Sequence, residues 1–232
     1  MKTIGILGGM SPESTVAYYE YITRTYTQRF GDYSYPEILI YSVSFQPYVD
    51  WPEAGRWDLV AQGLSRAARH LAAAGADFAL IATNTMHKVF DDVQASVDIP
   101  MLSLLDAVGG AIAAEGLNAV GLLGTRFTME ANFYPNALRR HDIEVVTPSA
   151  EARAAVDRVI YEELVAGRLR NASRRRFVEI IETLTERGAQ GVILGCTEIP
   201  LLVQAEDVDV PLFDTTTIHA EAALRYALAG DV

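Results

Sequence analysis

The sequence predicts an α/β protein built from two similar halves, each with a mostly parallel sheet. Short apolar runs alternate with longer helical patterns along all 232 residues, and this alternation is typical of parallel sheets covered by helices. Several short runs, such as 191–194, are apolar at every position, as expected for strands that are buried on both faces. Because such folds bind ligands beyond the carboxyl ends of their strands, the turns that follow the strands are the candidate sites.

The expected elements follow one another along the chain in this alternating pattern. Strands are expected at 3–7, 37–43, 78–82, 119–123, 144–146 and 191–194. Helices are expected at 12–29, 57–74, 87–96, 129–140, 151–166 and 172–187. The first helix begins at Ser11-Pro12, where a capping side chain precedes a proline at the first helical position. The last repeats apolar residues from Phe177 to Leu184 at the spacing of a helix with one buried face.

Two strands that end in glycine indicate an internal repeat. The run ending at Gly8 resembles the run ending at Gly124, and each is followed much later by a strand that ends in a polar loop. Nearly the same length of chain separates Gly8 from Thr83 and Gly124 from Cys196. We therefore expect a first half of 1–100 plus 212–232 and a second half of 101–211. The two loops would then face a small-molecule site between the halves.

Composition and charge exclude several classes of partner. A formal net charge of −11 argues against nucleic acid and against anionic membrane surfaces. No apolar run approaches the roughly 20 residues that cross a bilayer, and the first apolar run is too short for a secretion signal. We expect a cytoplasmic protein whose one cysteine, Cys196, stays reduced. The four histidines lack metal-ligand spacing, so we predict no metal.

The single cysteine follows the apolar run 192–194 and Gly195 at a predicted strand-to-helix turn. The positive end of a helix favours the thiolate, which is the form of cysteine that acts as a base or a nucleophile. The alternative interpretation of Cys196 is a small buried apolar residue. Glu198 has three interpretations: it orients the thiol, it accepts a substrate amino group, or it is an acid favoured at a helix start.

Three other turns carry polar groups. Segment 8–11 (GGMS) lacks the fingerprints of dinucleotide and P-loop sites. We interpret it as a small-anion turn made of backbone N–H groups, with a plain tight turn as the alternative. Segment 83–85 (TNT) offers donors for a carboxylate or caps the following helix. His87, just beyond it, is interpreted as a capping or structural residue. Thr125 and Thr128 repeat the donor-rich turn, with Thr128 as the expected helix cap.

Together these segments resemble the aspartate/glutamate racemase family of cofactor-independent amino-acid racemases. The matching segments are 8–11 with 13–15, 83–88, 124–126 with 128–130, 195–199, and 213–215 with 219–220, which span essentially the whole chain. The resemblance implies two pseudo-symmetric α/β domains with the active site between them, and a thiol in each half that removes or returns the α-proton. It also implies that the α-carboxylate is bound by Asn84, Thr85 and Thr197, and that the pocket is lined by Met10, Thr125 and Thr128.

This chain departs from the two-thiol pattern of that family. Thr83 occupies the first thiol position, and an aliphatic hydroxyl is a far poorer base than a thiol near neutral pH. We therefore predict that Cys196 abstracts the proton and that Thr83, or a water it holds, reprotonates the opposite face. A threonine here resembles the L-aspartate/L-glutamate-specific subgroup. Segment 44–53 lacks that subgroup's acid at position 44 and glutamine at 52, which leaves another amino acid open as the substrate.

Two other functions remain as alternatives. A single-cysteine decarboxylase of the same fold would use the thiol to protonate an enediolate, and it would need an apolar pocket that the polar turns here do not favour. A catalytically decayed amino-acid-binding protein would keep the pocket without turnover. A homodimer is also expected, and Trp51, Trp57 and the tyrosines at 18, 19 and 21 are candidates to cover its interface.

Overall fold

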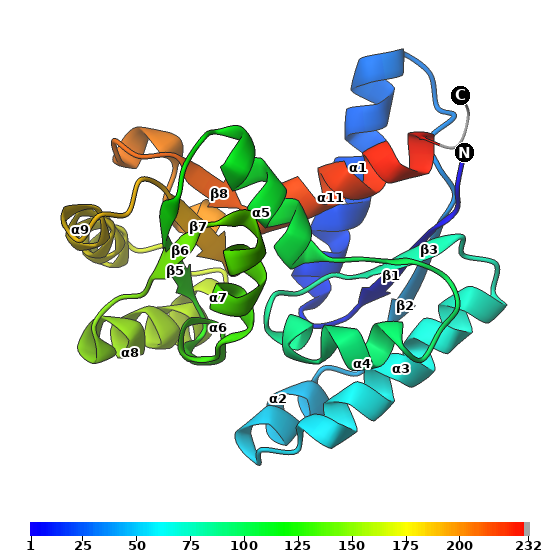
Figure 1. Ribbon diagram of the computed structural model, residues 1–232, viewed down its shortest axis with the longest axis horizontal. Helices are drawn as coiled ribbons and strands as arrows, with labels where there is room; N and C mark the ends of the chain where they lie inside the picture. Colours follow the sequence, from blue (N-terminus) through cyan, green and yellow to red (C-terminus); the bar gives the residue numbers. More distant parts are fainter. Residues whose placement is uncertain (230–232) are drawn as a thin grey trace. The chain divides into compact units, whose positions relative to one another are not determined.

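The computed structural model describes residues 1–229, and it forms two compact units (Figure 1). Unit 1 comprises Met1–Leu104 together with the segment from Thr216 onward, and unit 2 comprises Leu105–Thr215. Each unit contains a four-stranded sheet whose strand pairings are all parallel. The predicted α/β class with two parallel sheets is confirmed. Residues 230–232, at the end of the predicted first half, lie outside the described residues.

Unit 1 has the strand order β2-β1-β3-β4. Its strands are β1 (Ile4–Gly8), β2 (Ile38–Ser42), β3 (Phe78–Ile81) and β4 (Met101–Leu102). Its helices are α1 (Pro12–Phe30), α2 (Gln46–Glu53), α3 (Trp57–Ala73), the 3-10 helix η1 (Thr85–Val89), α4 (Phe90–Gln94) and nearly all of α11 (Thr215–Leu228).

Helices cover both faces of this sheet, and successive strand residues point to opposite faces. On one face, Ile6 and Leu80 pack with Tyr18 and Ile22 of α1 and Leu224 of α11. On the other face, Leu7 and Ile81 pack against α3 and α4 through side chains that include Leu64, Leu71 and Val93. This burial on two sides is the reason that the strands are apolar at consecutive positions.

Unit 2 has the order β6-β5-β7-β8, which repeats the order of unit 1 strand for strand. Its strands are β5 (Ala119–Gly124), β6 (Glu144–Val146), β7 (Val192–Gly195) and β8 (Leu212–Asp214). Its helices are α5 (Leu104–Ala114), α6 (Arg126–Glu130), α7 (Phe133–Leu138), η2 (Arg139–His141), α8 (Ala150–Val159), the π-helix η3 (Ile160–Leu164), α9 (Asn171–Glu186), α10 (Ile199–Leu202) and η4 (Ala205–Asp207). The internal repeat seen in the sequence is therefore a repeat of topology.

The strand registers give Thr83 and Cys196 equivalent positions in their own units. In unit 1 Leu7 pairs with Ile81, and in unit 2 Leu123 pairs with Leu194. Thr83 and Cys196 each lie two residues beyond the second member of these pairs. Thr83 therefore lies in the turn after β3, and Cys196 lies in the equivalent turn after β7.

Several elements differ from the sequence prediction. The predicted helix 129–140 is divided into α6, α7 and η2, because Ala131 is extended at φ −82° and ψ 151°. The elements β4, β8, α2, α5 and α11 were not predicted. Tyr18 is completely buried inside unit 1, so its suggested place on a dimer face is wrong. Its neighbour Tyr19 is 44% exposed.

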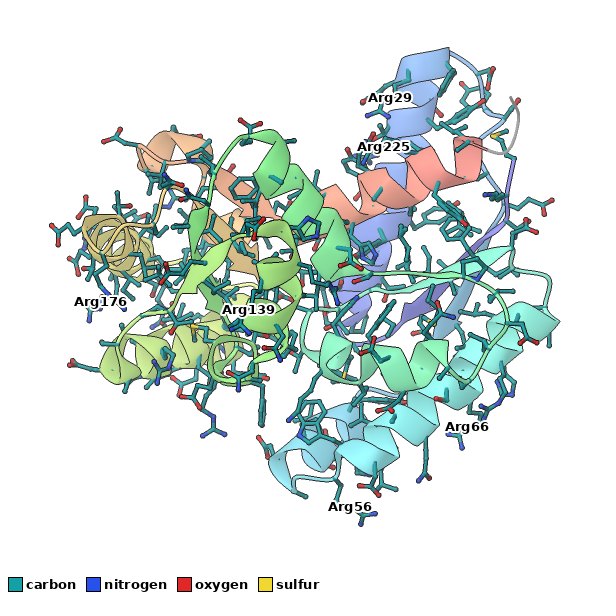
Figure 2. All side chains as sticks on the ribbon, in the orientation of Figure 1. Arg29, Arg56, Arg66, Arg139, Arg176 and Arg225 are labelled. Carbon is teal, nitrogen blue, oxygen red and sulfur yellow. The ribbon has the colours of Figure 1, made fainter. Side chains whose placement is uncertain are left out.

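The helix α11 is tied to α1 by polar contacts as well as by the core. Arg29, near the end of α1 (Figure 2), donates to both carboxylate oxygens of Glu221 at 2.8 Å. Tyr21 donates to the same carboxylate at 3.1 Å.

No helix within residues 1–229 has the length and apolar character required to cross a bilayer.

The turn after β1 depends on glycine. Gly9 has φ +91°, and a Cβ there would clash with the main-chain oxygen of Val43 and lie 2.7 Å from its nitrogen. Gly31 has φ +74° but open space around the same position. We expect Gly9→Ala to lower the free energy of unfolding by about 3 kcal/mol, from strain plus overpacking, and Gly31→Ala by about 1 kcal/mol, from strain alone. Urea unfolding of the two variants measures both losses in the free energy of unfolding. Equal losses would show that the clash between the new Cβ and Val43 does not destabilise the fold.

Candidate active site

Cys196 lies in the turn after β7 and is bound to a buried carboxylate. Its Sγ donates to Oε2 of Glu198 at 2.9 Å, and the hydroxyl of Thr197 donates to the same oxygen at 2.9 Å. Glu198 is only 6% exposed. It stands at the cap position of α10 without a side-chain cap hydrogen bond. The geometry therefore favours a carboxylate that orients the thiol over an acid that caps the helix.

The environment of Cys196 opposes ionisation of the thiol. Burial raises the pKa of Cys196 well above its ordinary value, and the negative charge of Glu198 raises this pKa further. Backbone N–H groups of Glu198 and Thr197 lower the pKa, but by less. This net rise in pKa is opposite to the shift toward thiolate that the sequence predicts for a helix start. The helix that was expected to favour it, α10, has only four residues, whereas an acid lies directly on the sulfur.

Thr125 and Thr128 form a second polar pair in unit 2. Thr125 is the cap of α6, and its hydroxyl accepts from the N–H of Thr128 at 3.4 Å and lies 3.1 Å from the Thr128 hydroxyl. Thr128, the expected cap, instead lies inside α6 and is fully buried, because the helix begins earlier than predicted. Gly124 and Gly195 are paired across β5 and β7, so the Thr125 and Cys196 turns lie at the same sheet edge.

In unit 1 the segment 83–85 leaves β3 in a tight turn. The N–H of Thr83 donates to the carbonyl of Ile81 at 2.9 Å, and the carbonyl of Asn84 accepts from the N–H of His87 at 3.0 Å. Asn84 is buried, whereas Thr83 and Thr85 are partly buried. Asn84 makes no side-chain cap hydrogen bond to η1, so the geometry does not support the helix-cap interpretation for this side chain.

The glycine-rich turn after β1 is held by its own hydrogen bonds. The N–H of Gly9 donates to the hydroxyl of Thr15 at 2.8 Å, and the hydroxyl of Ser11 accepts from the N–H of Ser14 at 3.2 Å. The Ser14 hydroxyl donates to the carbonyl of Ala82 at 2.7 Å, which joins this turn to the end of β3. Met10 is 4% exposed and belongs to the core. The tight-turn interpretation fits better than the anion site, because the N–H of Gly9 is already used.

Two buried histidines brace unit 1 behind these turns. The Nδ1–H of His87 donates to the carbonyl of Thr83 at 2.8 Å, and its Nε2 accepts from the N–H of Leu104 at 3.1 Å. His219 donates from Nε2 to the carbonyl of Leu102 at 3.0 Å and accepts from the hydroxyl of Tyr18 at 2.8 Å. Each ring uses one nitrogen as donor and one as acceptor, which only a neutral imidazole does. The structural interpretation of His87 is confirmed.

The predicted site residues thus form two groups, one in each unit. Unit 2 holds Thr125, Thr128, Cys196, Thr197 and Glu198, and unit 1 holds Met10, Thr83, Asn84 and Thr85. No cluster of three or more His, Cys, Asp or Glu side chains within residues 1–229 is arranged to hold a metal ion. His219 is a buried polar residue to which the sequence pattern assigns no role; its only local signal is its place beside Ala220, Ala223 and Ala227, which lie on the buried side of α11.

The pattern of one known family, described as Asp/Glu/Hydantoin racemase, matches residues 7–223. The chain belongs to this family. Its enzymes are isomerases, and the chain is an amino-acid racemase family member. The broad specificity amino-acid racemase RacX of Bacillus subtilis is 25% identical to it over 97% of this chain and 98% of that protein.

Two solved racemase-family structures are also similar to the whole chain. A Yersinia pestis protein assigned as an Asp/Glu racemase is 47% identical with a TM-score of 0.93. An aspartate racemase homologue from Pyrococcus horikoshii is 43% identical with a TM-score of 0.85. Each comparison covers 98% of this chain and 100% of the other. The fold expected from the resemblance is therefore that of solved racemase-family proteins.

We expect His219 to make the stability of this racemase-family protein sensitive to acid. Burial, with a smaller contribution from His87, lowers the pKa of His219 to about 3. The unfolded chain binds a proton near pH 6.5, so the folded state holds fewer protons between these values, and the free energy of unfolding falls as the pH drops from about 6.5 toward 3. We expect His219 to contribute a slope of up to about 1.4 kcal/mol per pH unit.

Urea unfolding between neutral and acid pH measures this slope. His219→Gln keeps a donor and an acceptor but removes the titration, so its pH dependence should be flatter than that of the unmodified chain. The control is His70→Gln at an exposed histidine, which should leave the slope unchanged. An equally steep slope in His219→Gln would assign the acid sensitivity to other groups.

Proposed function

We propose that this chain racemises an amino acid without a cofactor, with Cys196 as the base at Cα and Thr83 serving the opposite face. The observation that carries the proposal is the equivalence of the two turns: Thr83 and Cys196 follow matching strands at the same register position. Inversion at carbon requires one proton donor and one proton acceptor on opposite faces, and a repeated half-structure supplies one position for each.

In this mechanism Glu198 accepts the proton of the Cys196 thiol and so generates the thiolate base. Because burial and the charge of Glu198 raise the pKa of the Cys196 thiol, the mechanism starts from the protonated thiol, whose proton first passes along the existing hydrogen bond to Glu198. The thiolate then forms a new S–H bond with the α-proton, and the electron pair of the broken C–H bond spreads into the substrate carboxylate. Water held by Thr83 protonates the opposite face, and the hydroxide left behind takes the proton from Glu198 through solvent. Thiol, carboxylate and water are then restored.

The remaining predicted residues hold the substrate. Asn84, Thr85 and Thr197 donate to the α-carboxylate, and these fixed donors stabilise the charge that develops on it in the transition state. Met10, Thr125 and Thr128 line the pocket. Support comes from their positions: each lies within the turn after a strand or in the first turn of the following helix.

The substrate that we propose is L-aspartate or L-glutamate. The family description and the name of the Pyrococcus horikoshii protein both support an acidic amino acid. The name of RacX supports a wider range. Segment 44–53, which departs from the expected subgroup, contains α2 with prolines at 47 and 52. If this segment contacts the substrate side chain, a different amino acid is the substrate.

One observation favours a second function. A neutral thiol is the form that delivers a proton, and a single-cysteine decarboxylase needs a thiol in that form to protonate an enediolate. The raised pKa of Cys196 fits this chemistry as well as a racemase that depends on Glu198. The decarboxylase needs no acceptor for the thiol proton before its chemical step, and this difference separates the two functions.

We also propose that the chain acts as a homodimer in the cytoplasm. The free thiol of Cys196 fits a reducing compartment. Exposed apolar side chains on unit 1, among them Tyr19, Tyr33 and Ile40, supply a surface for a second copy.

Exchange of the α-proton in D₂O tests the racemase proposal. We expect loss of the NMR signal of the α-proton from L-aspartate or L-glutamate, with the D-isomer accumulating more slowly because Thr83 is the weaker partner. Cys196→Ser should lower the exchange rate by about 10³-fold, since a hydroxyl replaces the thiol base. Thr83→Ala should retain exchange from the L-isomer while losing D-product.

The same measurement has outcomes that contradict the proposal. Exchange that survives Cys196→Ser would exclude the thiol as the base. No exchange with either isomer of aspartate or glutamate, combined with binding of these ligands, would favour the decayed binding protein. Loss of CO₂ from an added dicarboxylic acid by the unmodified chain, without exchange, would favour the decarboxylase.

The role of Glu198 gives a separate prediction. Glu198→Gln removes the negative charge beside the sulfur, so the pKa of Cys196 should fall toward its ordinary value. The exchange rate should nevertheless drop by about 10²-fold or more, because the acceptor for the thiol proton is lost. Ultraviolet absorbance of the thiolate against pH measures the first effect, and α-proton exchange measures the second. An exchange rate that rises with the thiolate fraction would show that Glu198 only suppresses the thiolate.

A further inference from the structure

A pocket of about 560 Å³ lies in unit 2 between α8, α9 and the loop that follows β6. We propose that this pocket binds a small anion with two negative charges, either a phosphate monoester or a dicarboxylate. The inference does not depend on the racemase mechanism, because it rests on arginines outside the residues assigned to that mechanism.

The pocket arises where the two units differ. In unit 1, β2 pairs with β1 up to its last residue, as Gly8 is matched with Ser42. In unit 2, the pairing of β6 stops at Val146 opposite Gly121, although β5 continues to Gly124. The chain therefore leaves the sheet early, and the loop 147–149 turns into α8 and forms one wall of the pocket.

Two arginines are fixed on this wall. Arg153 of α8 donates from Nη1 to the carbonyl of Pro148 at 2.8 Å, and Arg187, just beyond α9, donates from Nη1 to the carbonyl of Thr147 at 2.7 Å. Their guanidinium groups are thus anchored to neighbouring carbonyls from two different helices. Each guanidinium has five N–H donors, so both keep donors for a ligand. Arg153 also contacts Glu130 at 3.3 Å.

The charge of the pocket favours an anion. Arg176, which projects from α9 (Figure 2), is a third arginine in the lining, and Glu179, at 3.0 Å from it, is the only acid among the lining residues. This positive lining stands out in a chain with a net charge of −11. The ten-residue helix α8 also begins here, and the partial positive charge of a helix start adds to the attraction.

The shape and chemistry of the lining define the ligand class. A planar guanidinium group can donate two hydrogen bonds to two oxygens of one phosphate or carboxylate group. The guanidinium groups of Arg153 and Arg187 therefore suit a ligand with two negative charges. Ala152 of α8 and Ile180 of α9, which are 8% and 4% exposed, add small apolar contacts to the lining. The volume falls in the range of sites that bind small molecules.

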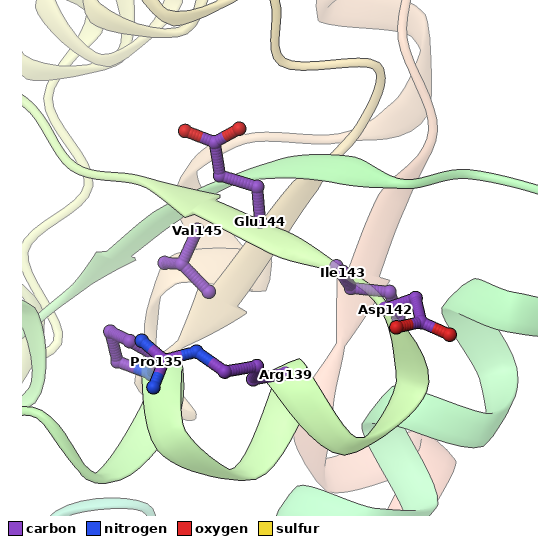
Figure 3. A pocket seen from close by; sticks show the side chains of 6 residues that line it. All are labelled: Pro135, Arg139, Asp142, Ile143, Glu144 and Val145. Atoms are coloured by element: carbon purple, nitrogen blue, oxygen red, sulfur yellow. The ribbon is translucent and has the colours of Figure 1, made fainter.

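A second pocket of unit 2 provides the matched control. It has a volume of about 330 Å³ and contains Arg139 together with Asp142 and Glu144, so its acids outnumber its arginine (Figure 3). Arg139→Ala removes the same charge from the same unit as Arg187→Ala does, but at a pocket that should repel anions.

Isothermal titration calorimetry of the full chain with phenyl phosphate, inorganic phosphate and succinate tests the proposal. We expect binding that weakens with added sodium chloride, and a loss of about tenfold or more in affinity for Arg187→Ala and Arg153→Ala. Arg139→Ala should leave the affinity unchanged. Glu179→Gln should tighten binding about threefold, a gain that a misfolded variant would not show. Preference for phenyl phosphate or for succinate identifies which of the two chemistries the pocket takes.

Three results would overturn the proposal. Absence of binding for all three probes would show that the arginines only brace the loop. Binding that is equally weakened by Arg139→Ala would indicate a general charge effect. Loss of succinate binding in Thr197→Val, at a proposed carboxylate donor, would place the probe at the catalytic turn instead.

Discussion

The parallel registry of the central strands is the constraint on which the rest of the structure depends. Each central pair, β1 with β3 and β5 with β7, is buried on both faces, so a slip by one residue would exchange every side chain between two different cores. The registry therefore fixes where each strand ends. The polar turns lie at one edge of each sheet because the strand registers align the strand ends. The glycines at positions 9, 124 and 195 allow neighbouring atoms to approach more closely there than a Cβ would permit.

In the mechanism that we propose, the thiol of Cys196 keeps its proton until the substrate binds. In the resting protein the shared oxygen of Glu198 holds both Cys196 and Thr197. In that mechanism, the contact that opposes ionisation of the thiol would also carry its proton to Glu198, and the reactivity of the thiol would depend on the balance between burial and the charge brought by the substrate. A substrate carboxylate that competes for the Thr197 hydroxyl would leave Glu198 with fewer donors, and the carboxylate would then bind the thiol proton more strongly.

The sequence was sufficient for the elements that carry strong local patterns. Buried strands such as 191–194, the cap at Ser11 and the repeat of glycine-ended strands all appear in the structure. The two-residue strand β4 and the three-residue strand β8 are too short to show a pattern. The protonation state of Cys196 depends on which way one neighbouring side chain turns, and the partner of His219, Tyr18, is 201 positions away. Neither fact is present in local sequence.

Helix α11 has a consequence for how the chain is made. Unit 2 is inserted between the two segments of unit 1, and α11 supplies Ala220, Ala223, Leu224 and Ala227 to a core that α1 otherwise covers only in part. During synthesis the ribosome releases all of unit 2 before this helix emerges. The earlier-made segment must therefore wait with one face of its sheet incomplete while the later-made unit acquires its own core, and the order of completion is the reverse of the order of translation.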